Sequence, residues 1–337
     1  MERSSRTQRS LCVIVALSCS ATSATIHAAD LEIHIPVPGT GGQTRRMLLH
    51  LPANAQASGP VPIVLGFHGG FGNAELFRSL TGLNATADAR GFGVAYMDAG
   101  DGVWGDYRPG PGQPDVDLSY VNAAMDYLVA NHNADARRFY ATGISNGAAF
   151  SFVLGAELPH RIAAIAPVAH NITQAFVDQA TPKGPMNVLQ IVGSADPLMP
   201  FAGGVQGSGD QVLSSVATMQ YWKNLNGNGA STTSPLPNVA TDGTTAVRET
   251  FAPSPTGIEL ERIVVINGGH TWPGGEQYLP TSTIGLTSRD FHANDVIWEF
   301  FSDKALAIPG PGTTLAMITG LGLARRPRRD PIRSNLP

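Results

Sequence analysis

The feature that most constrains this chain is the stretch at residues 138–153, where an apolar run passes through Gly143-Ile-Ser145-Asn-Gly147 into small and apolar residues. The pattern predicts a buried strand, a tight turn that carries Ser145, and a helix. Such a turn strains the serine backbone and leaves little room two positions away on either side, so Gly143 and Gly147 are needed. The helix would direct free N–H groups toward the serine. A Gly/Ser turn in any α/β sheet is the alternative explanation.

Along the rest of the chain, short apolar runs alternate with helical patterns. Continuous apolar runs are typical of strands buried on both faces, and they occur at residues 62–67, 93–97, 139–142, 163–168, 187–192 and 263–266. This alternation predicts a mostly parallel, doubly wound sheet with helices on both faces. Since the serine turn lies among these strands, we predict a single α/β-hydrolase domain over residues 30–304.

Three further segments complete the predicted domain. Residues 31–35 and 47–51 predict an antiparallel hairpin at the edge of the sheet. Residues 224–245 are rich in Asn, Gly, Ser, Thr and Pro, which indicates a surface excursion and not a domain linker. The clearest helical pattern covers residues 117–129, and its predicted buried face consists of Leu118, Val121, Met125, Leu128 and Val129.

The first 29 residues predict a signal peptide. Three arginines precede an apolar run at residues 11–17, and small residues follow up to a cleavage site after Ala28 or Ala29. The run is too short to span a bilayer, so we expect a secreted bacterial protein, extracellular or periplasmic. A lipoprotein cut before Cys19 is the alternative. Because Cys12 and Cys19 both lie in this segment, the mature chain would have no disulfide, thiolate metal site or cysteine nucleophile.

The sequence of residues 305–337 predicts a second processing segment. A Pro/Gly linker leads into an apolar stretch at residues 313–324 and then into a cluster of arginines. This arrangement resembles the PEP-CTERM sorting signal, with Gly310 where that family usually has Glu. The resemblance implies envelope association and a transient contact with a membrane sorting enzyme before the tail is removed. A frayed tail with a weak amphipathic helix is the alternative.

The charge distribution restricts the partners. The full chain has 22 Lys and Arg against 26 Asp and Glu. Eight of the basic residues but only two of the acidic ones lie in the terminal segments, so the remaining domain has a net charge near −10. An acidic domain with no basic patch argues against a nucleic-acid partner and favours a neutral or weakly charged substrate.

Two later loops supply what an acyl-transferring serine needs, a general base and an orienting carboxylate. In α/β-hydrolases the order is Ser, then acid, then His, in loops after successive strands. Asp196 follows the strand predicted at residues 187–192, and His270 lies in a glycine-flanked loop after the strand at residues 263–266. A turn aspartate is the alternative for Asp196.

The other histidines are assigned lesser roles: His170 as the rival base, His132 and His160 at the surface, and His292 as a structural residue.

The loop after the first central strand predicts the oxyanion hole. It contains His68-Gly69-Gly70, and glycines there let backbone N–H groups point into a cleft. We expect one donor from Gly69 or Gly70 and a second from Asn146, with His68 bracing the loop at the edge of the substrate site. The mechanism built from these groups needs neither a metal nor an organic cofactor.

Four motifs together resemble a known family. They are Thr142-Gly-Ile-Ser-Asn-Gly147, His68-Gly69-Gly70, Gly193-Ser-Ala-Asp-Pro-Leu-Met-Pro200 and Gly268-Gly-His-Thr-Trp-Pro-Gly-Gly275. The chain is similar over residues 60–301 to secreted polyhydroxybutyrate depolymerases, which are close to the feruloyl and acetylxylan esterases of carbohydrate esterase family one. Many relatives have Cys where Gly70 stands, and Ala148-Ala149 replaces a second glycine that often follows the serine turn, so the substrate preference stays open.

The resemblance implies an α/β-hydrolase fold and assigns Ser145, Asp196 and His270 as the catalytic triad. It also implies that Trp272 forms a cleft wall beside the base and that Trp104 lines the cleft, with core packing as the alternative for both rings.

The first functional hypothesis is therefore a secreted serine esterase that acts on polyhydroxybutyrate, a related polyester or its oligomers. The second is a feruloyl or acetylxylan esterase acting on plant polysaccharide. A non-catalytic envelope or matrix protein on the same fold and a serine peptidase are the remaining alternatives. The oligomeric state is not indicated by the sequence.

Overall fold

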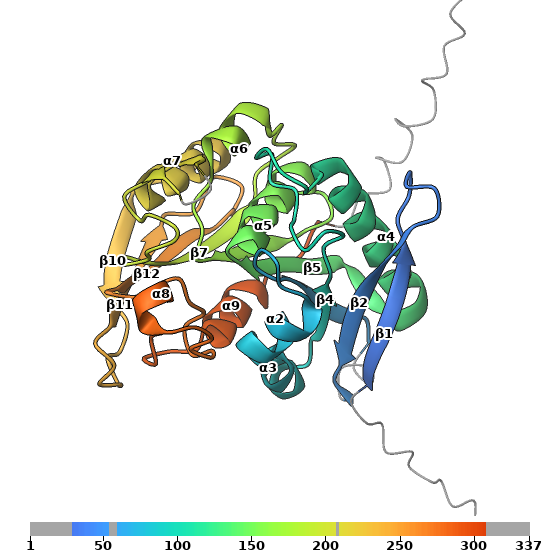
Figure 1. The fold of residues 1–337 in the computed structure, drawn as a ribbon, viewed down its shortest axis with the longest axis horizontal. Helices are drawn as coiled ribbons and strands as arrows, with labels where there is room; N and C mark the ends of the chain where they lie inside the picture. Colours follow the sequence, from blue (N-terminus) through green and yellow to red (C-terminus); the bar gives the residue numbers. More distant parts are fainter. Residues whose placement is uncertain (1–28, 54–58, 207–208, 308–337) are drawn as a thin grey trace, which may run out of the picture.

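The computed structural model describes residues 29–53, 59–206 and 209–307 (Figure 1). The predicted signal peptide up to residue 28 and the predicted tail from residue 308 onward lie outside the described residues, so neither prediction is tested. In the described part of the chain, no helix combines the length and apolar character needed to cross a bilayer.

Strands and helices alternate through the domain. The strands are β1 (Ala29–Pro36), β2 (Thr44–Leu51), β3 (Val61–Phe67), β4 (Gly93–Met97), β5 (Ala134–Ile144), β6 (Ala164–Val168), β7 (Asn187–Gly193), β8 (Gly204–Val205), β9 (Gln211–Val212), β10 (Ser231–Pro235), β11 (Thr245–Phe251) and β12 (Leu260–Ile266). The helices are α2 (Ala74–Thr81), α3 (Leu83–Arg90), α4 (Pro114–His132), α5 (Asn146–Glu157), α6 (Gln174–Gln179), α7 (Ser215–Asn226), α8 (Thr281–Ile284) and α9 (Ala293–Phe301).

The described strands form one large sheet and a separate two-stranded ribbon, β8–β9. The order in the large sheet is β1-β2-β4-β3-β5-β6-β7-β12-β11-β10. The six strands from β4 to β12 in this order pair in parallel. Antiparallel pairs lie at both edges: β1 with β2, which continues antiparallel onto β4, and β10 with β11, which continues onto β12. The predicted edge hairpin is confirmed, with Leu31 opposite Leu49.

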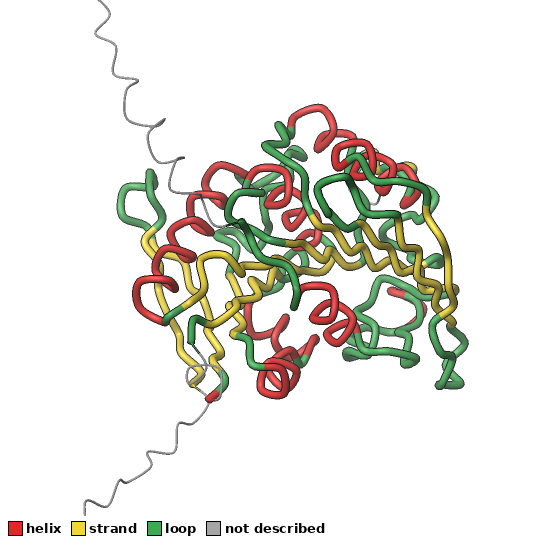
Figure 2. The backbone as a smooth tube through the Cα atoms, turned by 180° about the vertical axis from the view of Figure 1, so that it is seen from behind, coloured by secondary structure: helices red, strands yellow, loops and turns green. Residues whose placement is uncertain are grey.

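Helices cover both faces of the sheet (Figures 1 and 2). One face packs against α4, α5, α6 and α7 in a core that includes Met125, Phe150 and Trp222. The other packs against α2, α3 and α9 in a core that includes Phe77 and Ile297. The predicted doubly wound α/β-hydrolase architecture is therefore confirmed. Parallel strands end at the same edge of such a sheet, so the loops that follow β3, β5, β7 and β12 meet there.

Helix α5 is the central helix. All of its residues are buried, and it packs against β5 and β6. A helix that is apolar on every side belongs inside a protein, and here Phe150 stacks on Trp104 with ring centroids 5.1 Å apart. The residue before α5 is Ser145, which therefore lies on a rigid support.

Two details of the sequence prediction are wrong. On α4, Leu118 is half-buried and Val129 is 39% exposed, whereas Tyr120 and Ala124 are buried. Tyr120 belongs to the buried face of α4, and its hydroxyl donates to the carbonyl of Arg46 on β2 (2.6 Å). The predicted excursion at residues 224–245 does lie at the surface, but it contains a strand that was not predicted, β10, whose sequence has no apolar alternation because the whole strand is exposed at the sheet edge.

Candidate active site

Ser145 occupies the strained turn between β5 and α5. Its backbone has φ 56° and ψ −123°. A Cβ added at Gly143 would lie 2.6 Å from the carbonyl oxygen of Phe67, and one at Gly147 would lie 2.2 Å from the same oxygen. These distances are shorter than any normal contact, so the predicted need for glycine at both positions is confirmed. The start of α5 therefore crosses close over the end of β3.

His270 and Asp196 form a buried pair. The Nδ1 of His270 lies 2.8 Å from Oδ2 of Asp196, while Oδ1 of the same carboxylate accepts the backbone N–H groups of Leu198 and Met199, both at 2.8 Å. A carboxylate facing Nδ1 keeps the proton on that nitrogen, which leaves Nε2 as the basic atom. The two N–H donors hold the carboxylate in its orientation.

The two loops that carry this pair contact each other through glycines and backbone hydrogen bonds. The N–H of Ala195 donates to the carbonyl of Gly268 (2.9 Å), and a Cβ at Gly193 would lie 2.3 Å from that carbonyl oxygen. The N–H of His270 donates to Ile284 (2.6 Å), at the end of α8. The glycines are therefore required by close packing, which places Asp196 and His270 side by side.

Ser145 and His270 line one cavity of about 630 Å³, a normal volume for a small-molecule site. The structure thus brings together the three residues predicted for the triad, with Asp196 buried behind His270. The cavity walls are formed by His68, Gly69, Gly70, Phe71, Gly72, Leu76, Phe77, Ser79, Leu80, Ile144, Leu198, Glu276, Tyr278 and Leu279.

The predicted oxyanion loop lies beside the serine. A Cβ at Gly69 would lie 3.5 Å from Cβ of Ser145, and one at Gly70 would lie 3.8 Å from Cβ of Asn146. As the first residue of α5, Asn146 has a backbone N–H without an acceptor in its own helix. Its side chain points away into the core, where Oδ1 accepts the N–H of Trp104 (2.7 Å). The groups predicted to stabilise an oxyanion therefore lie together around Ser145.

His68 lines the cavity, and its ring also holds the predicted oxyanion loop in place. Its Nδ1 lies 2.7 Å from the carbonyl oxygen of Gly69, and its Nε2 accepts the N–H of Ala99 (3.1 Å). Only the neutral tautomer with hydrogen on Nδ1 makes both bonds, and burial lowers the pKa of His68, which favours the neutral ring. In a trans peptide the C=O and N–H point in opposite directions. The bond to the Gly69 carbonyl therefore turns the N–H of Gly70 away from His68.

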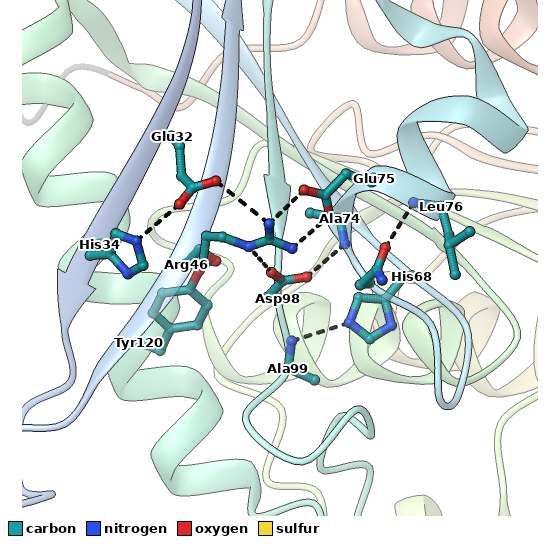
Figure 3. Close-up of polar contacts among 11 residues, drawn as sticks. Glu32, His34, Arg46, His68, Ala74, Glu75, Leu76, Asp98, Ala99 and Tyr120 are labelled. Atoms are coloured by element: carbon teal, nitrogen blue, oxygen red, sulfur yellow. Dashed lines mark hydrogen bonds and ion pairs between the residues drawn. The ribbon is translucent and has the colours of Figure 1, made fainter.

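A charged cluster supports the same loop and the adjoining wall of the cavity (Figure 3). Arg46 on β2 binds Asp98 (2.6 Å) and both carboxylate oxygens of Glu75 (2.5 and 2.6 Å). These bonds raise the pKa of Arg46, and the bond to Arg46 lowers the pKa of Glu75. Asp98 also accepts the N–H of Ala74 (2.6 Å), the first residue of α2. The cluster joins β2, the end of β4 and α2, which forms one wall.

The predictions for Trp104 and Trp272 are wrong, because both rings are completely buried and neither lines the cavity. The indole N–H of Trp104 donates to the carbonyl of His68 (3.2 Å). Trp272 packs edge-on against Phe77 and donates to Oδ1 of Asn294 (2.9 Å). Core packing, the alternative for both, describes their role, since each supports a wall from behind.

His170 is not placed as a base. It is 1% exposed, and neither ring nitrogen has a hydrogen-bond partner among the described residues. Burial lowers its pKa well below the usual value. His292 accepts the N–H of Asn294 (3.2 Å) at the start of α9, as expected for a structural residue. His160 is exposed and His132 is half-buried.

The sequence analysis did not predict a role for Tyr278 and Leu279, which follow His270 in the chain. The hydroxyl of Tyr278 donates to the carbonyl of His270 (2.9 Å), and burial raises the pKa of this tyrosine to about 12. The ring of Tyr278 and the neighbouring Leu279 line the cavity. The only signal in the sequence was their closeness to His270.

Comparison with known proteins identifies the family. Residues 46–210 match the family model described as Esterase PHB depolymerase. A protein of Nocardia uniformis subsp. tsuyamanensis that is named as an esterase, NocK, is 32% identical over 277 residues, which cover 77% of this chain and 79% of the relative. The chain belongs to the PHB depolymerase family of esterases. It is a carboxylic ester hydrolase.

Other relatives of this esterase differ in length and substrate. Feruloyl esterase B of Piromyces equi is 26% identical over 191 residues, and the match spans 54% of this chain but 36% of that protein. The solved acetyl xylan esterase of Aspergillus awamori superposes with a TM-score of 0.54 at 17% identity, covering 81% of this chain and 99% of the other. The structural match supports the α/β-hydrolase fold of this esterase.

Replacing Gly147 by Ala should prevent this esterase from folding or lower its free energy of unfolding by roughly 4 kcal/mol or more, because the new methyl group would overlap the Phe67 carbonyl. The matched variant Gly70→Ala meets nothing closer than 3.8 Å and should lose about 1 kcal/mol or less. Urea unfolding measures both. Equal losses in the two variants would contradict the close packing described for the turn.

His68→Asn and His68→Gln should separate the two bonds of His68. Asn can keep the donor to the Gly69 carbonyl, whereas Gln can keep only an acceptor for the N–H of Ala99. We expect kcat to fall by about threefold or less for Asn and by roughly 10- to 100-fold for Gln, with KM little changed, since the oxyanion forms only in the transition state. Kinetics on a soluble p-nitrophenyl ester measure this. Equal loss of kcat in both variants would show that the Gly69 bond is not decisive.

His170 should make the fold sensitive to acid. The unfolded chain binds a proton at His170 below about pH 6.5, whereas burial keeps the folded ring neutral, so the free energy of unfolding should fall by up to roughly 1.4 kcal/mol per pH unit below that point. His170→Leu should remove this contribution and leave stability at pH 8 unchanged or higher. Urea unfolding between pH 4.5 and 8 tests it, and an unaltered slope in the variant would refute the assignment.

Proposed function

We propose that this esterase uses Ser145, His270 and Asp196 as its catalytic residues and acts on an aliphatic polyester of the hydroxyalkanoate type or its oligomers. The observation that carries the proposal is the buried pair of His270 and Asp196, 2.8 Å apart, which ends in the cavity that Ser145 also lines. That arrangement supplies a nucleophile, a base and an orienting carboxylate in one site.

The reaction begins with the attack of Ser145 Oγ on the ester carbonyl. His270 takes the serine proton on Nε2, and the resulting imidazolium is stabilised by Asp196. The carbonyl oxygen becomes an oxyanion, which accepts hydrogen bonds from Asn146 N–H and from Gly69 or Gly70 N–H. Each such donor contributes roughly 3 kcal/mol to transition-state stability in comparable sites.

The tetrahedral intermediate collapses when the bond to the alcohol oxygen breaks and His270 returns its proton to that oxygen. Water then attacks the acyl group on Ser145 while His270 again acts as the base. The carboxylic acid leaves and Ser145 regains its proton. Apart from the ester and water, only side chains and backbone groups of the described site take part, so the scheme requires no cofactor.

The composition of the cavity supports an apolar, uncharged substrate. Its walls carry Phe71, Leu76, Leu198 and Leu279, and Glu276 is its one carboxylate. The match to the Esterase PHB depolymerase model favours a polyester in this site. A feruloyl or acetylxylan ester is the second candidate, favoured by the similarity to feruloyl esterase B and by the aromatic rings of Phe71 and Tyr278 at the cavity.

The remaining predictions form part of the same proposal. Cleavage of residues 1–29 would release the enzyme into the periplasm or medium, and residues 305–337 would act as a removable sorting tail. A non-catalytic binding protein is a poor explanation, because it would not need the hydrogen bonds that orient Asp196 and His270.

The first experiment is product release by the chain from residue 30 onward. Amorphous polyhydroxybutyrate, hydroxybutyrate oligomers, methyl ferulate and acetylated xylan serve as parallel substrates. Release of 3-hydroxybutyrate without ferulate or acetate supports the polyester proposal. Ferulate or acetate release favours the second candidate, and no release from any substrate contradicts both.

Ser145→Ala and His270→Ala should each lower kcat by roughly 10⁴- to 10⁶-fold, and Asp196→Asn by roughly 10⁴-fold, because nucleophile, base and orienting carboxylate act as a unit. Steady-state kinetics on a p-nitrophenyl ester measure the loss, and circular dichroism checks that each variant is folded. His292→Ala, which changes a helix cap, is the matched histidine control and should keep near-normal turnover. Near-normal turnover in a triad variant would refute its assignment.

A further inference from the structure

Phe71 combines two features that are unfavourable for folding. Its backbone has φ +59°, a left-handed conformation that bulky residues rarely adopt, and the residue is 88% exposed. A large apolar side chain gains little stability when water surrounds it. Strained residues that bring no packing benefit are concentrated at functional sites. The strain and exposure of Phe71 therefore suggest that its ring has a functional role.

The surrounding turn enforces this conformation. The N–H of Phe71 donates to the carbonyl of Gly102 (2.7 Å), and the N–H of Gly72 donates to the carbonyl of Gly69 (3.0 Å). A Cβ added at Gly102 would lie 3.5 Å from Cα of Phe71, so the two loops are in contact. The backbone of Phe71 is therefore held on both sides, directly after Gly70, one of the predicted oxyanion donors.

Phe71 lies in a rim of exposed apolar side chains. Single exposed apolar residues are common on protein surfaces, but here several line the cavity that contains Ser145. The rim residues, with their exposed fractions, are Phe71 (88%), Leu76 (59%), Leu198 (45%), Leu279 (44%) and Tyr278 (40%). They come from the oxyanion loop, α2, the acid loop and the segment after the base. A set of exposed apolar groups converging on one site indicates a binding surface.

The chemistry of the rim favours an apolar chain. Three of its five members are leucines, which offer no hydrogen bonds, and the one carboxylate of the cavity is Glu276. A sugar chain would need several hydrogen-bonding groups to replace its contacts with water. The methylene and methyl groups of a polyester need only apolar contact. The rim therefore matches the part of a polyester that extends beyond the ester being cleaved.

We propose that Phe71 is a specificity-determining residue: its strained turn presents the ring to the apolar chain of a hydroxyalkanoate substrate outside the cavity. The contact requires a substrate longer than one ester unit, so it selects oligomers and polymer over short esters. This inference rests on the proposed action on a hydroxyalkanoate polyester, and it names a residue that makes the enzyme prefer longer substrates.

Two variants separate the ring from the strain. Phe71→Gly removes both, whereas Phe71→Ala removes the ring and keeps the unfavourable backbone conformation. Both should lose roughly tenfold in kcat/KM on hydroxybutyrate tetramers and less than twofold on p-nitrophenyl acetate. The Gly variant should unfold at a temperature about 2 °C above that of the Ala variant. Equal activity with unequal stability is the result that a purely structural role would not produce.

The control is Val239→Ala, which changes an exposed side chain (74%) outside this cavity and should leave every rate unchanged. An equal loss on the tetramer and on p-nitrophenyl acetate would overturn the proposal, as would activity that follows the unfolding temperature. Rates on acetylated xylo-oligosaccharides of matched length form a further arm. A tenfold loss there, with none on the polyester tetramer, would refute the assignment to polyester.

A binding measurement keeps this inference separate from the proposed function. Ser145→Ala and Ser145→Ala/Phe71→Gly are compared for adsorption to amorphous polyhydroxybutyrate particles, which requires no turnover. At least fivefold weaker adsorption of the double variant supports the role of Phe71, even if the parent enzyme proves inactive on the polymer. Equal adsorption refutes it, even if the parent enzyme is a depolymerase.

Discussion

The close crossing of α5 over the end of β3 is the constraint on which the site depends. Gly143 and Gly147 lie so near the Phe67 carbonyl that no side chain fits. This contact turns the chain sharply at Ser145, directs the start of α5 toward the cavity, and leaves the loop after β3 beside the serine. The positions of Ser145 and of the predicted oxyanion donors thus follow from one packing contact.

Hydrogen bonds to backbone groups hold the other half of the site. Asp196 is oriented by the N–H groups of the residues that follow it, and the loop of His270 is tied to the acid loop through Gly268. The loop after β3 is similarly held by His68 and, through α2, by the cluster around Arg46. Rigid surroundings of this kind reduce the reorganisation needed when charge develops on the substrate.

Much of this could be predicted from the sequence, because parallel buried strands and glycine-dependent turns leave local signals. The fold, the need for Gly143 and Gly147 and the convergence of Ser145, Asp196 and His270 were of this kind. Burial of Trp104 and Trp272 was not, since an aromatic residue in a loop has the same local pattern whether it lines a cleft or packs behind it. The rim also left no signal, because Leu76, Leu198 and Leu279 converge only through tertiary structure.

Tyr278 performs two tasks with one side chain. Its ring forms part of the cavity wall, and its hydroxyl holds the backbone of His270. The shape of the cavity and the position of His270 are consequently not independent. A smaller residue at this position would enlarge the pocket but also release the loop of His270. The cavity can therefore be reshaped more easily at Leu198, Leu279 or Phe71, because their apolar side chains form no hydrogen bond that positions Ser145, His270 or Asp196.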